Sequence, residues 1–266
     1  MDKQVILVTG ASAGIGRECA DRLQRSNTTV VAASRRAIAT GPWNGLVMDV
    51  DSDESVRQGI KSILEQHGRL DAVIACAGWG MAGAVEDTPI GDAKALFETN
   101  FWGCVRVVQA ALPIFRRQGN GRVILMSSIA GIIGLPYQGF YSASKFALEG
   151  YAEALAYEVK PFNIHVTLVE PGNFKTDFTA NRRVVPVSGD DAYTPARDKA
   201  IAVMVNEEVN GADPRNIATL VAKLLKSPKP PRRASVGKLD ERIGILGKRL
   251  IPYRIFERAA KASLGI

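Results

Sequence analysis

Thr9-Gly10-Ala11-Ser12-Ala13-Gly14-Ile15-Gly16 is the stretch of sequence that decides the expected fold. It follows a short apolar run, Gln4–Thr9, and opens a stretch with helical spacing, Ile15–Arg25. Its glycines let the backbone turn tightly and approach a pyrophosphate, whose negative charge is favoured at a helix N-terminus. The spacing is GxxxGxG and no Walker lysine follows. A tight turn in any α/β protein is the alternative reading of such a loop, but its place between strand and helix favours dinucleotide binding.

Apolar runs and helical stretches alternate along the rest of the chain. The expected strands are Gln4–Thr9, Thr28–Ser34, Gly45–Val50, Leu70–Ala75, Gly121–Ser127 and Asn163–Glu170, with a seventh near Ala234–Val236. The expected helices are Ile15–Arg25, Asp53–Gln66, Asp92–Arg117, Ser142–Pro161 and Pro214–Leu225. Continuous apolar runs are typical of parallel strands that are covered on both faces. The pattern predicts an α/β fold of the Rossmann type, a doubly wound parallel sheet of about seven strands in three layers.

The length and composition fit one domain. The chain has 266 residues, of which 46% are hydrophobic and 23% charged, so we expect a single dinucleotide-binding Rossmann domain over residues 1–266. The longest irregular stretch, Asn173 to about Ala200, predicts a substrate lid at about 173–205. Three widely spaced cysteines indicate a reducing, cytoplasmic setting, and we find neither a signal peptide nor an apolar run of membrane-spanning length.

Metal and triad chemistry are not expected. The only histidines are His67 and His165, and the sequence has neither a CxxC nor an HExxH pattern. These residues make no convincing zinc site or Ser-His-Asp triad, so acid–base chemistry must come from other side chains.

The end of the second expected strand indicates which dinucleotide binds. An NAD site usually places an acidic residue there for the ribose 2′-hydroxyl, whereas this chain has Ser34-Arg35-Arg36. Two guanidinium groups and a hydroxyl suit a 2′-phosphate, which an acidic residue would repel. A solvated loop is the alternative, but beside the glycine-rich loop these residues favour NADP(H).

Tyr141 and Lys145 are the candidate acid–base pair. They lie four residues apart at the start of an expected helix and therefore share one of its faces. The Lys145 ammonium would stabilise a Tyr141 phenolate, which suits proton transfer. Ser128 lies 13 residues before Tyr141, at the carboxyl end of an expected strand, where parallel sheets bind their ligands.

With these residues in this order, the chain resembles the short-chain dehydrogenase/reductase family, in its single-domain form, over nearly its whole length. The matching positions are Thr9–Gly16, Asp49-Val50, Ala77-Gly78, Asn100, Ser128, Tyr141, Lys145, and Pro171-Gly172 with Thr176. The sequence around Tyr141 to Asp177 is most similar to the steroid- and retinoid-type branch of that family.

The resemblance implies a role for each of these residues. Ser128 would polarise a substrate carbonyl, Tyr141 would protonate the developing alkoxide, Lys145 would bind the nicotinamide ribose, and Asn100 would hold a water that relays protons to Lys145. Hydride would come from the dinucleotide. The implied cofactor-binding residues are Gly10, Ser12, Gly14, Ile15, Gly16, Ser34, Arg35, Arg36, Asp49, Val50, Ala77, Gly78, Tyr141, Lys145, Pro171, Gly172, Phe174 and Thr176.

The chain departs from the family pattern at two places. The usual Asn-Asn-Ala-Gly reads here Ala75-Cys76-Ala77-Gly78, so the amide side chains are missing. Cys76 is expected to be a small buried residue and not a nucleophile. Ala13 stands where many NADP-preferring members carry a basic residue, so the NADP prediction rests on residues 34–36.

The substrate pocket is expected to be apolar. Segments Trp79–Ala84, Ile129–Tyr137 and Asn173–Tyr193 would surround it. Their apolar side chains are Trp79, Met81, Ile132, Ile133, Leu135, Tyr137, Phe174 and Phe178. Few charges lie near them, which favours a bulky hydrophobic carbonyl or alcohol, steroid-, retinoid- or lipid-like, over a phosphorylated sugar.

The net charge of +7 comes from the C-terminal part of the chain. From Lys226 onward there are 11 Lys or Arg residues against 3 Asp or Glu, and before it 23 against 24. The segment 232–266 mixes aliphatic and basic residues. It is either a basic amphipathic element on an anionic membrane surface or a helix that closes the pocket or packs between subunits. Pro252, Gly244 and Gly247 argue against one long helix.

The sequence leads to an oxidoreductase that interconverts a ketone or aldehyde and an alcohol with NADP(H). A catalytically silent, NADP-binding regulatory protein is the alternative, but such proteins typically lose Ser, Tyr or Lys from the site, and this chain keeps all three. Nucleic-acid binding has no recognition motif in its support and is not expected. By resemblance, the helices that end near Arg117 and begin near Tyr141 would form a homodimer or homotetramer interface.

Overall fold

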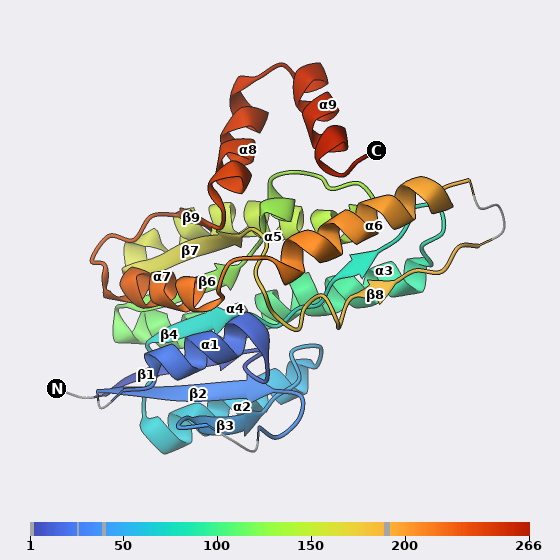
Figure 1. The fold of residues 1–266 in the computed structure, drawn as a ribbon. Helices are drawn as coiled ribbons and strands as arrows, with labels where there is room; N and C mark the ends of the chain where they lie inside the picture. Colours follow the sequence, from blue (N-terminus) through green and yellow to red (C-terminus); the bar gives the residue numbers. More distant parts are fainter. Residues whose placement is uncertain (1–2, 26, 39–40, 189–191) are drawn as a thin grey trace.

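The computed structural model describes residues 3–25, 27–38, 41–188 and 192–266. A 7-stranded sheet lies at its centre, with the strand order β3-β2-β1-β4-β6-β7-β9 (Figure 1). Its strands are β1 Gln4–Thr9, β2 Thr28–Ser34, β3 Asn44–Val47, β4 Ala72–Ala75, β6 Gly121–Met126, β7 Ile164–Pro171 and β9 Arg233–Val236. All neighbouring strands in this sheet run parallel. The predicted α/β fold with its doubly wound parallel sheet is confirmed.

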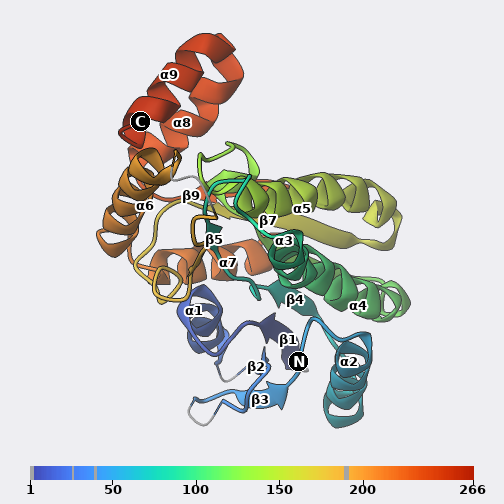
Figure 2. The ribbon, with the colours of Figure 1, turned by 90° about the vertical axis from the view of Figure 1, so that its right-hand side faces the viewer.

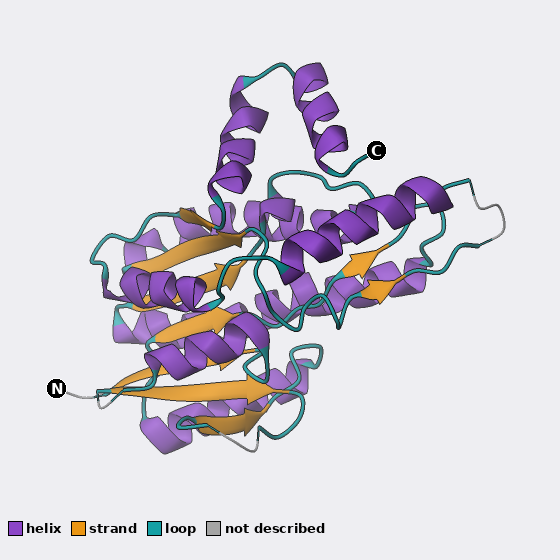
Figure 3. Ribbon diagram, viewed as in Figure 1, coloured by secondary structure: helices purple, strands orange, loops and turns teal. Residues whose placement is uncertain are grey.

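Helices cover both faces of the sheet and make three layers (Figures 2 and 3). The α-helices are α1 Gly14–Leu23, α2 Asp53–His67, α3 Ile90–Phe97, α4 Cys104–Gln118, α5 Gly139–Glu158, α6 Thr194–Val209, α7 Arg215–Lys226, α8 Leu239–Leu250 and α9 Tyr253–Ser263. Helices α2, α4 and α5 pack on one face, and α1 and α7 on the other. A second parallel pair, β5 Met81–Ala82 and β8 Arg183–Val184, lies beyond the main sheet.

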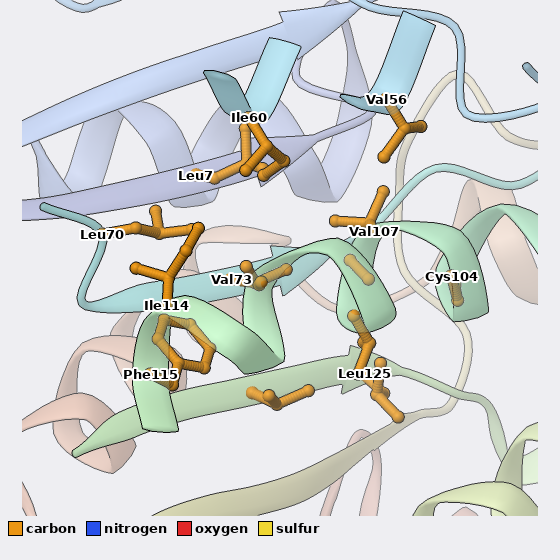
Figure 4. Packing of buried hydrophobic residues seen from close by; sticks show 14 of the residues in the cluster. Leu7, Val56, Ile60, Leu70, Val73, Cys104, Val107, Ile114, Phe115 and Leu125 are labelled. Carbon is orange, nitrogen blue, oxygen red and sulfur yellow. The ribbon is translucent and has the colours of Figure 1, made fainter. Parts of the chain in front are cut away.

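The core has two apolar layers because successive side chains of a strand point to opposite faces. On β1, Val5 and Leu7 join the layer under α2, α4 and α5, whereas Ile6 and Val8 join the layer under α1 and α7. Figure 4 shows part of the first layer, with fully buried Phe115 of α4 in one cluster with aliphatic side chains of β1, α2, β4 and β6. The sheet is therefore buried on both faces.

The strand order reverses between β1 and β4. Strands β2 and β3 continue from β1 in one direction, and β6, β7 and β9 continue from β4 in the other. The loops after β1 and β4 consequently diverge and leave a crevice at the carboxyl ends of the strands, where sheets of this kind bind ligands.

The helix predicted over Asp92–Arg117 is interrupted. Between α3 and α4 the chain forms a π-helical segment, Glu98–Gly103. Such segments add a residue to a turn and are frequent at functional sites. This one contains Asn100, which is fully buried.

Other predicted boundaries were also wrong. Strand β3 ends at Val47, and not at Val50, because the Asp49 side chain and carbonyl accept backbone N–H groups of the following turn. Helix α6 begins at Thr194, inside the stretch predicted to be irregular to about Ala200, because Pro195 in its first turn presets helical φ. Residues 189–191 of the predicted lid lie outside the described residues.

The C-terminal segment also differs from its prediction. Gly244 and Gly247 lie inside α8, so neither of them breaks the helix. The break falls at Ile251 and Pro252, where the chain leaves α8 and enters α9. Figures 1 and 2 show α8 and α9 as a helical hairpin that stands away from the three layers.

Candidate active site

Glycines at positions 10, 14 and 16 allow the turn after β1 to pack closely and still leave room for a phosphate. Gly10 and Gly14 have φ of 65° and 54°, in the left-handed region that side chains disfavour. A Cβ on Gly16 would lie 2.3 Å from the Gly10 carbonyl oxygen, and a Cβ on Gly10 would lie 2.8 Å from Ala77 Cα. The Thr9 hydroxyl accepts the N–H groups of Cys76 and Ala77, at 3.2 Å each. The two loops thus form a narrow cradle at the N-terminus of α1, which fits a dinucleotide pyrophosphate.

One cavity of about 1170 Å³ runs through the crevice from this cradle toward α8 and α9. Of the residues predicted from the sequence to hold the cofactor or act in catalysis, all but Asp49 and Asn100 line it. The structure therefore brings together residues from seven separate parts of the sequence: the turn after β1, the end of β2, the turn after β3, and the loops or helices after β4, β6 and β7, and α5.

The end of β2 presents two cations to this cavity. Arg35 and Arg36 are exposed and line it. The Ser34 hydroxyl donates a hydrogen bond to the Arg36 carbonyl. Ser34 therefore shapes the arginine loop, in addition to facing the cavity.

Asp51 replaces the predicted Asp49 at the wall of the cavity. Asp49 accepts the Asp51 N–H at 3.1 Å, which turns its carboxylate into the loop. Val50 and Asp51 line the cavity, and the Thr99 hydroxyl donates to the Asp51 carboxylate at 2.9 Å. Burial raises the pKa of Asp51 above its ordinary value, against the lowering effect of that hydrogen bond. The sequence-based prediction missed Asp51 because it extended β3 to Val50, whereas the strand ends at Val47.

Tyr141 and Lys145 lie in the first two turns of α5 and are both buried. The Lys145 ammonium is 5.8 Å from the centre of the Tyr141 ring and donates to the Met126 carbonyl at 2.9 Å. Ser128 follows the end of β6, and its hydroxyl accepts the Ala130 N–H at 3.1 Å. All three residues line the cavity.

Asn100 lies behind the cavity wall. Its amide oxygen accepts the Trp79 N–H and its amide nitrogen donates to the Trp79 carbonyl, both at 2.9 Å. A Cβ on Gly78 would lie 3.0 Å from Asn100 Oδ1 and 3.8 Å from Lys145 Nζ. Asn100 therefore holds the Gly78–Trp79 backbone beside Lys145, and the π-helical segment aims it there.

The loop after β7 is attached to the C-terminal hairpin. Pro171, Gly172, Phe174 and Thr176 line the cavity. Glu241 of α8 accepts the Asn173 N–H with one carboxylate oxygen and the Lys238 N–H with the other, both at 2.7 Å. No periodic pattern in the sequence predicts this attachment, since a carboxylate on an exposed helix is usually solvated.

Beyond Tyr141 the cavity is lined by many apolar side chains, with acidic Glu207 and Glu208 of α6 and Asp240 of α8 among them. Trp79, Ile129, Ile133, Leu135, Phe174 and Phe178 line it, together with Val203 and Met204 of α6 and Phe256 and Leu264 from the C-terminal hairpin. Met81, Ile132 and Tyr137, which were predicted to line the pocket, do not. Met81 is buried beneath the wall, and Ile132 packs against Ile245 of α8.

A buried carboxylate network behind α5 was not predicted. Glu149 lies one turn beyond Lys145 and accepts a hydrogen bond from Ser127, the neighbour of Ser128. Arg233 Nη1 lies 2.5 Å from Glu149 Oε2 and 3.4 Å from Glu170 Oε1. Burial raises the pKa of Glu149 to about 7, the Ser127 hydrogen bond lowers it, and Glu170 raises it further. Arg233 comes from β9, whose pairing with β7 could not be read from local sequence.

Cys76 lines the cavity but is a poor nucleophile. Its contact with Cys19 and its burial raise the pKa of the Cys76 thiol well above the ordinary value. Only the thiolate is strongly nucleophilic, so the thiol stays protonated at neutral pH. Within the described residues, no group of His, Cys, Asp or Glu is arranged to hold a metal ion.

The strand order, the glycine cradle and the Ser-Tyr-Lys group define a Rossmann-type oxidoreductase, and comparison with known proteins identifies the family. The family model for short chain dehydrogenases matches residues 4–184. The chain is 40% identical to a 3-ketodihydrosphingosine reductase of Bacteroides thetaiotaomicron, over 98% of both chains. It is 33% identical to Retinol dehydrogenase 8 of Bos taurus, over 86% of this chain and 80% of that protein.

A solved structure agrees with these matches. The crystal structure of a short-chain dehydrogenase from Streptomyces avermitilis superposes with a TM-score of 0.84 and 30% identity, over 98% of both chains. The protein belongs to the short-chain dehydrogenase/reductase family. It is therefore an oxidoreductase that acts on CH–OH and carbonyl groups with a nicotinamide cofactor.

Proposed function

We propose that the protein is an NADPH-dependent reductase of a ketone carried on a long-chain lipid. The observation that carries this proposal is the position of Ser128, Tyr141 and Lys145 on a cavity that continues into an apolar channel. That channel ends between α6 and the C-terminal hairpin, and the apolar side chains on its walls suit an alkyl chain.

The relatives support this substrate class. The Bacteroides relative is named for a keto lipid and matches this chain over 98% of both lengths, so its C-terminal region also aligns. A retinoid carbonyl is the second candidate, favoured by the 33% identity to Retinol dehydrogenase 8. Both substrates are long, apolar and poorly soluble, as the channel requires.

The preference for NADP(H) rests on Arg35 and Arg36. Both guanidinium groups stand at the cavity edge after β2, where a ribose 2′-phosphate would be bound, and residues 34–36 include no acidic side chain that would favour a 2′-hydroxyl. In the Arg35→Ala, Arg36→Ala double variant, we expect KM for NADPH to rise roughly tenfold or more, since a charge-assisted hydrogen bond contributes about 1.5–3 kcal/mol. The KM for NADH should change little.

The proposed chemistry uses the chain's own groups around the carbonyl. The cofactor, when bound, supplies the hydride. Ser128 donates a hydrogen bond to the substrate oxygen, and Tyr141 transfers its phenolic proton to that oxygen as negative charge develops. Lys145 stabilises the resulting phenolate. Asn100 fixes the backbone beside Lys145 through its two bonds to Trp79.

A catalytically silent regulatory protein is the alternative. It would not need Ser128, Tyr141 and Lys145 on one cavity wall, and this chain keeps all three there. The oxidoreductase proposal accounts for them.

We also propose a homo-oligomer formed through the outer faces of the π-helical segment Glu98–Gly103, α4 and α5. Trp102, Phe146 and Tyr157 expose 50%, 41% and 58% of their surface on these elements, where a second copy would cover them. The three cysteines are free, which suits a reducing compartment such as the cytoplasm.

The direct test is NADPH oxidation with 3-ketodihydrosphingosine, retinal and a short water-soluble ketone. We expect the keto lipid to give the highest kcat/KM. Tyr141→Phe should lower kcat at least about 100-fold while NADPH binding and the melting temperature stay unchanged. Activity retained in Tyr141→Phe would overturn the chemistry, and equal kcat/KM for all three substrates would overturn the substrate class.

A further inference from the structure

One face of α8 is apolar and exposed. Leu239, Ile243, Leu246 and Leu250 follow the spacing i, i+4, i+7 and i+11, so they form a single stripe along the helix. Their exposed fractions are 71%, 57%, 56% and 79%. Monomeric soluble proteins rarely leave a contiguous aliphatic stripe in water, and such patches mark interaction sites.

The opposite face of α8 fixes the direction in which this stripe points. Ile245 is buried against Ile132 and Ile133, and the Lys248 ammonium donates to the Ile132 carbonyl. Glu241 binds the loop after β7. The helix is attached by one face to the wall of the active-site cavity, so the aliphatic stripe cannot turn inward without breaking these contacts.

The turn between α8 and α9 continues the exposed apolar surface. Ile251 lies in this turn with an exposed fraction of 39%, and Tyr253 and Ile255 follow in the first turn of α9 at 72% and 57%. Figures 1 and 2 show the turn as the part of the hairpin farthest from the sheet. A tyrosine at the tip of an apolar projection is well suited to the boundary between water and hydrocarbon.

Cations surround the apolar surface. Arg242, Arg254 and Arg258 are exposed, and within the described part of the chain none of them has an ion-pair partner. Anionic lipid headgroups would complement them. A second copy of the hairpin packed against this one would bring like charges together, so the charge distribution favours an anionic lipid surface over a hairpin-to-hairpin dimer.

We propose that the α8–α9 hairpin docks the protein on an anionic lipid bilayer. Leu250, Ile251 and Tyr253 enter the boundary between headgroups and acyl chains, and the three arginines bind the headgroups. Within the described residues, no helix has the length and apolarity needed to cross a bilayer, and the proposal needs none, because attachment is through side chains at the surface.

The hairpin that docks also forms part of the cavity wall. Gly244 of α8 and Phe256, Ala260 and Leu264 from α9 and the residues after it line the cavity that holds Tyr141. Docking would therefore bring the apolar end of the cavity next to the bilayer, so that a lipid need not cross water to reach it. This consequence rests on the proposed lipid substrate; the docking itself does not.

Vesicle flotation of the full-length chain tests the docking. We expect the protein to float with vesicles of phosphatidylcholine and phosphatidylglycerol, to stay in solution with phosphatidylcholine alone, and to be released by high salt. The Leu250→Ser, Tyr253→Ser double variant should reduce the bound fraction at least about tenfold, because each large side chain adds apolar area to the contact.

Matched controls lie on α3, far along the chain from the hairpin. Ile90→Ser removes an aliphatic side chain that is 63% exposed, and Lys94→Glu reverses an exposed charge. Both should float like the wild type, whereas Arg254→Glu should bind several-fold less than Lys94→Glu. Equal flotation of the hairpin variants and their controls would overturn the proposal.

Sedimentation in the absence of lipid tests the competing occupant. If a second copy covers the stripe, the Leu250→Ser, Tyr253→Ser variant should sediment as a smaller oligomer than the wild type, and the wild type should not bind vesicles. That result would also overturn the proposal. Flotation is measured without turnover, so a failed keto-lipid assay leaves the docking result intact, and failed flotation leaves the substrate assay intact.

Discussion

The chain makes the same local structure twice, with different outcomes. At one place β1 runs through a turn with Gly10 and Gly14 into α1, and at the other β9 runs through Gly237 into α8. Helix α1 folds back on the sheet and buries Cys19, Ala20 and Leu23. Helix α8 stands away from the sheet and buries Ile245 while its aliphatic stripe stays in water.

The difference shows that a strand–glycine–helix unit does not by itself decide where the helix packs. Helix α1 returns to the sheet because α7 and strands β1 and β2 offer it an apolar surface. Strand β9 is the last strand of its sheet, so α8 has a neighbour on one side only. The first unit binds a cofactor between rigid elements, whereas the second leaves a surface available for another partner.

The largest expected contrast compares one leucine from each helix. Leu23→Ala in α1 should lower the free energy of unfolding by about 2–5 kcal/mol, because the Leu23 side chain is only 7% exposed and its removal leaves a cavity. Leu250→Ala in α8 should stay within about 0.5 kcal/mol, since no packing is lost. Denaturant unfolding measures both; similar losses would mean that α8 is packed as tightly as α1.

A second contrast compares the two glycine turns. In Gly16→Ala the new Cβ meets the Gly10 carbonyl oxygen, so stability should fall by about 1–3 kcal/mol and NADPH binding should be lost. In Gly237→Ala the Cβ meets the Glu241 carboxylate instead, so the strain falls on the attachment of α8 and not on the cradle. Nucleotide fluorescence titration should show near-normal NADPH binding for Gly237→Ala. Equal loss in the two variants would contradict a cradle specific to the first turn.

The third prediction concerns the attachment of α8. Glu241→Gln leaves one of two backbone N–H groups without its carboxylate acceptor, which weakens a charge-assisted hydrogen bond of about 1.5–3 kcal/mol. Limited trypsin digestion should cut the hairpin roughly tenfold faster, while global unfolding changes little. Glu257→Gln in α9, which loses only an exposed pair with Lys261, is the matched control and should be cut like the wild type.

The fourth prediction concerns a pH dependence at Glu149. The pKa of this carboxyl is raised to about 7 from its ordinary 4.5, so the folded state keeps a proton that the unfolded state has lost. The stabilisation is complete below pH 4.5 and is lost as the pH rises to about 7. The unfolding free energy is measured against pH for the wild type and for Glu149→Gln. The difference between the two curves should isolate the loss of stability that Glu149 causes. A flat difference would show that the Arg233 ion pair keeps Glu149 ionised.

The sequence by itself determined the cofactor half of the molecule. Strands β1 and β2 lie where their apolar runs predicted, and Gly10–Gly16, Ser128, Tyr141 and Lys145 come together on one cavity. These features depend on short-range properties: backbone freedom at glycine, apolar runs the length of a buried strand, and the turn spacing that puts Tyr141 and Lys145 on one helix face.

Tertiary structure decided the remainder. The π-helical segment that buries Asn100, the meeting of Glu149 with Arg233, and the attachment of Glu241 to the loop after β7 join residues that are distant in sequence. No local pattern specifies such pairings, because each depends on which strand becomes the sheet edge. The same physical reason governs the tail: its aliphatic and basic residues were readable, but only the packing of α8 shows which of them face water.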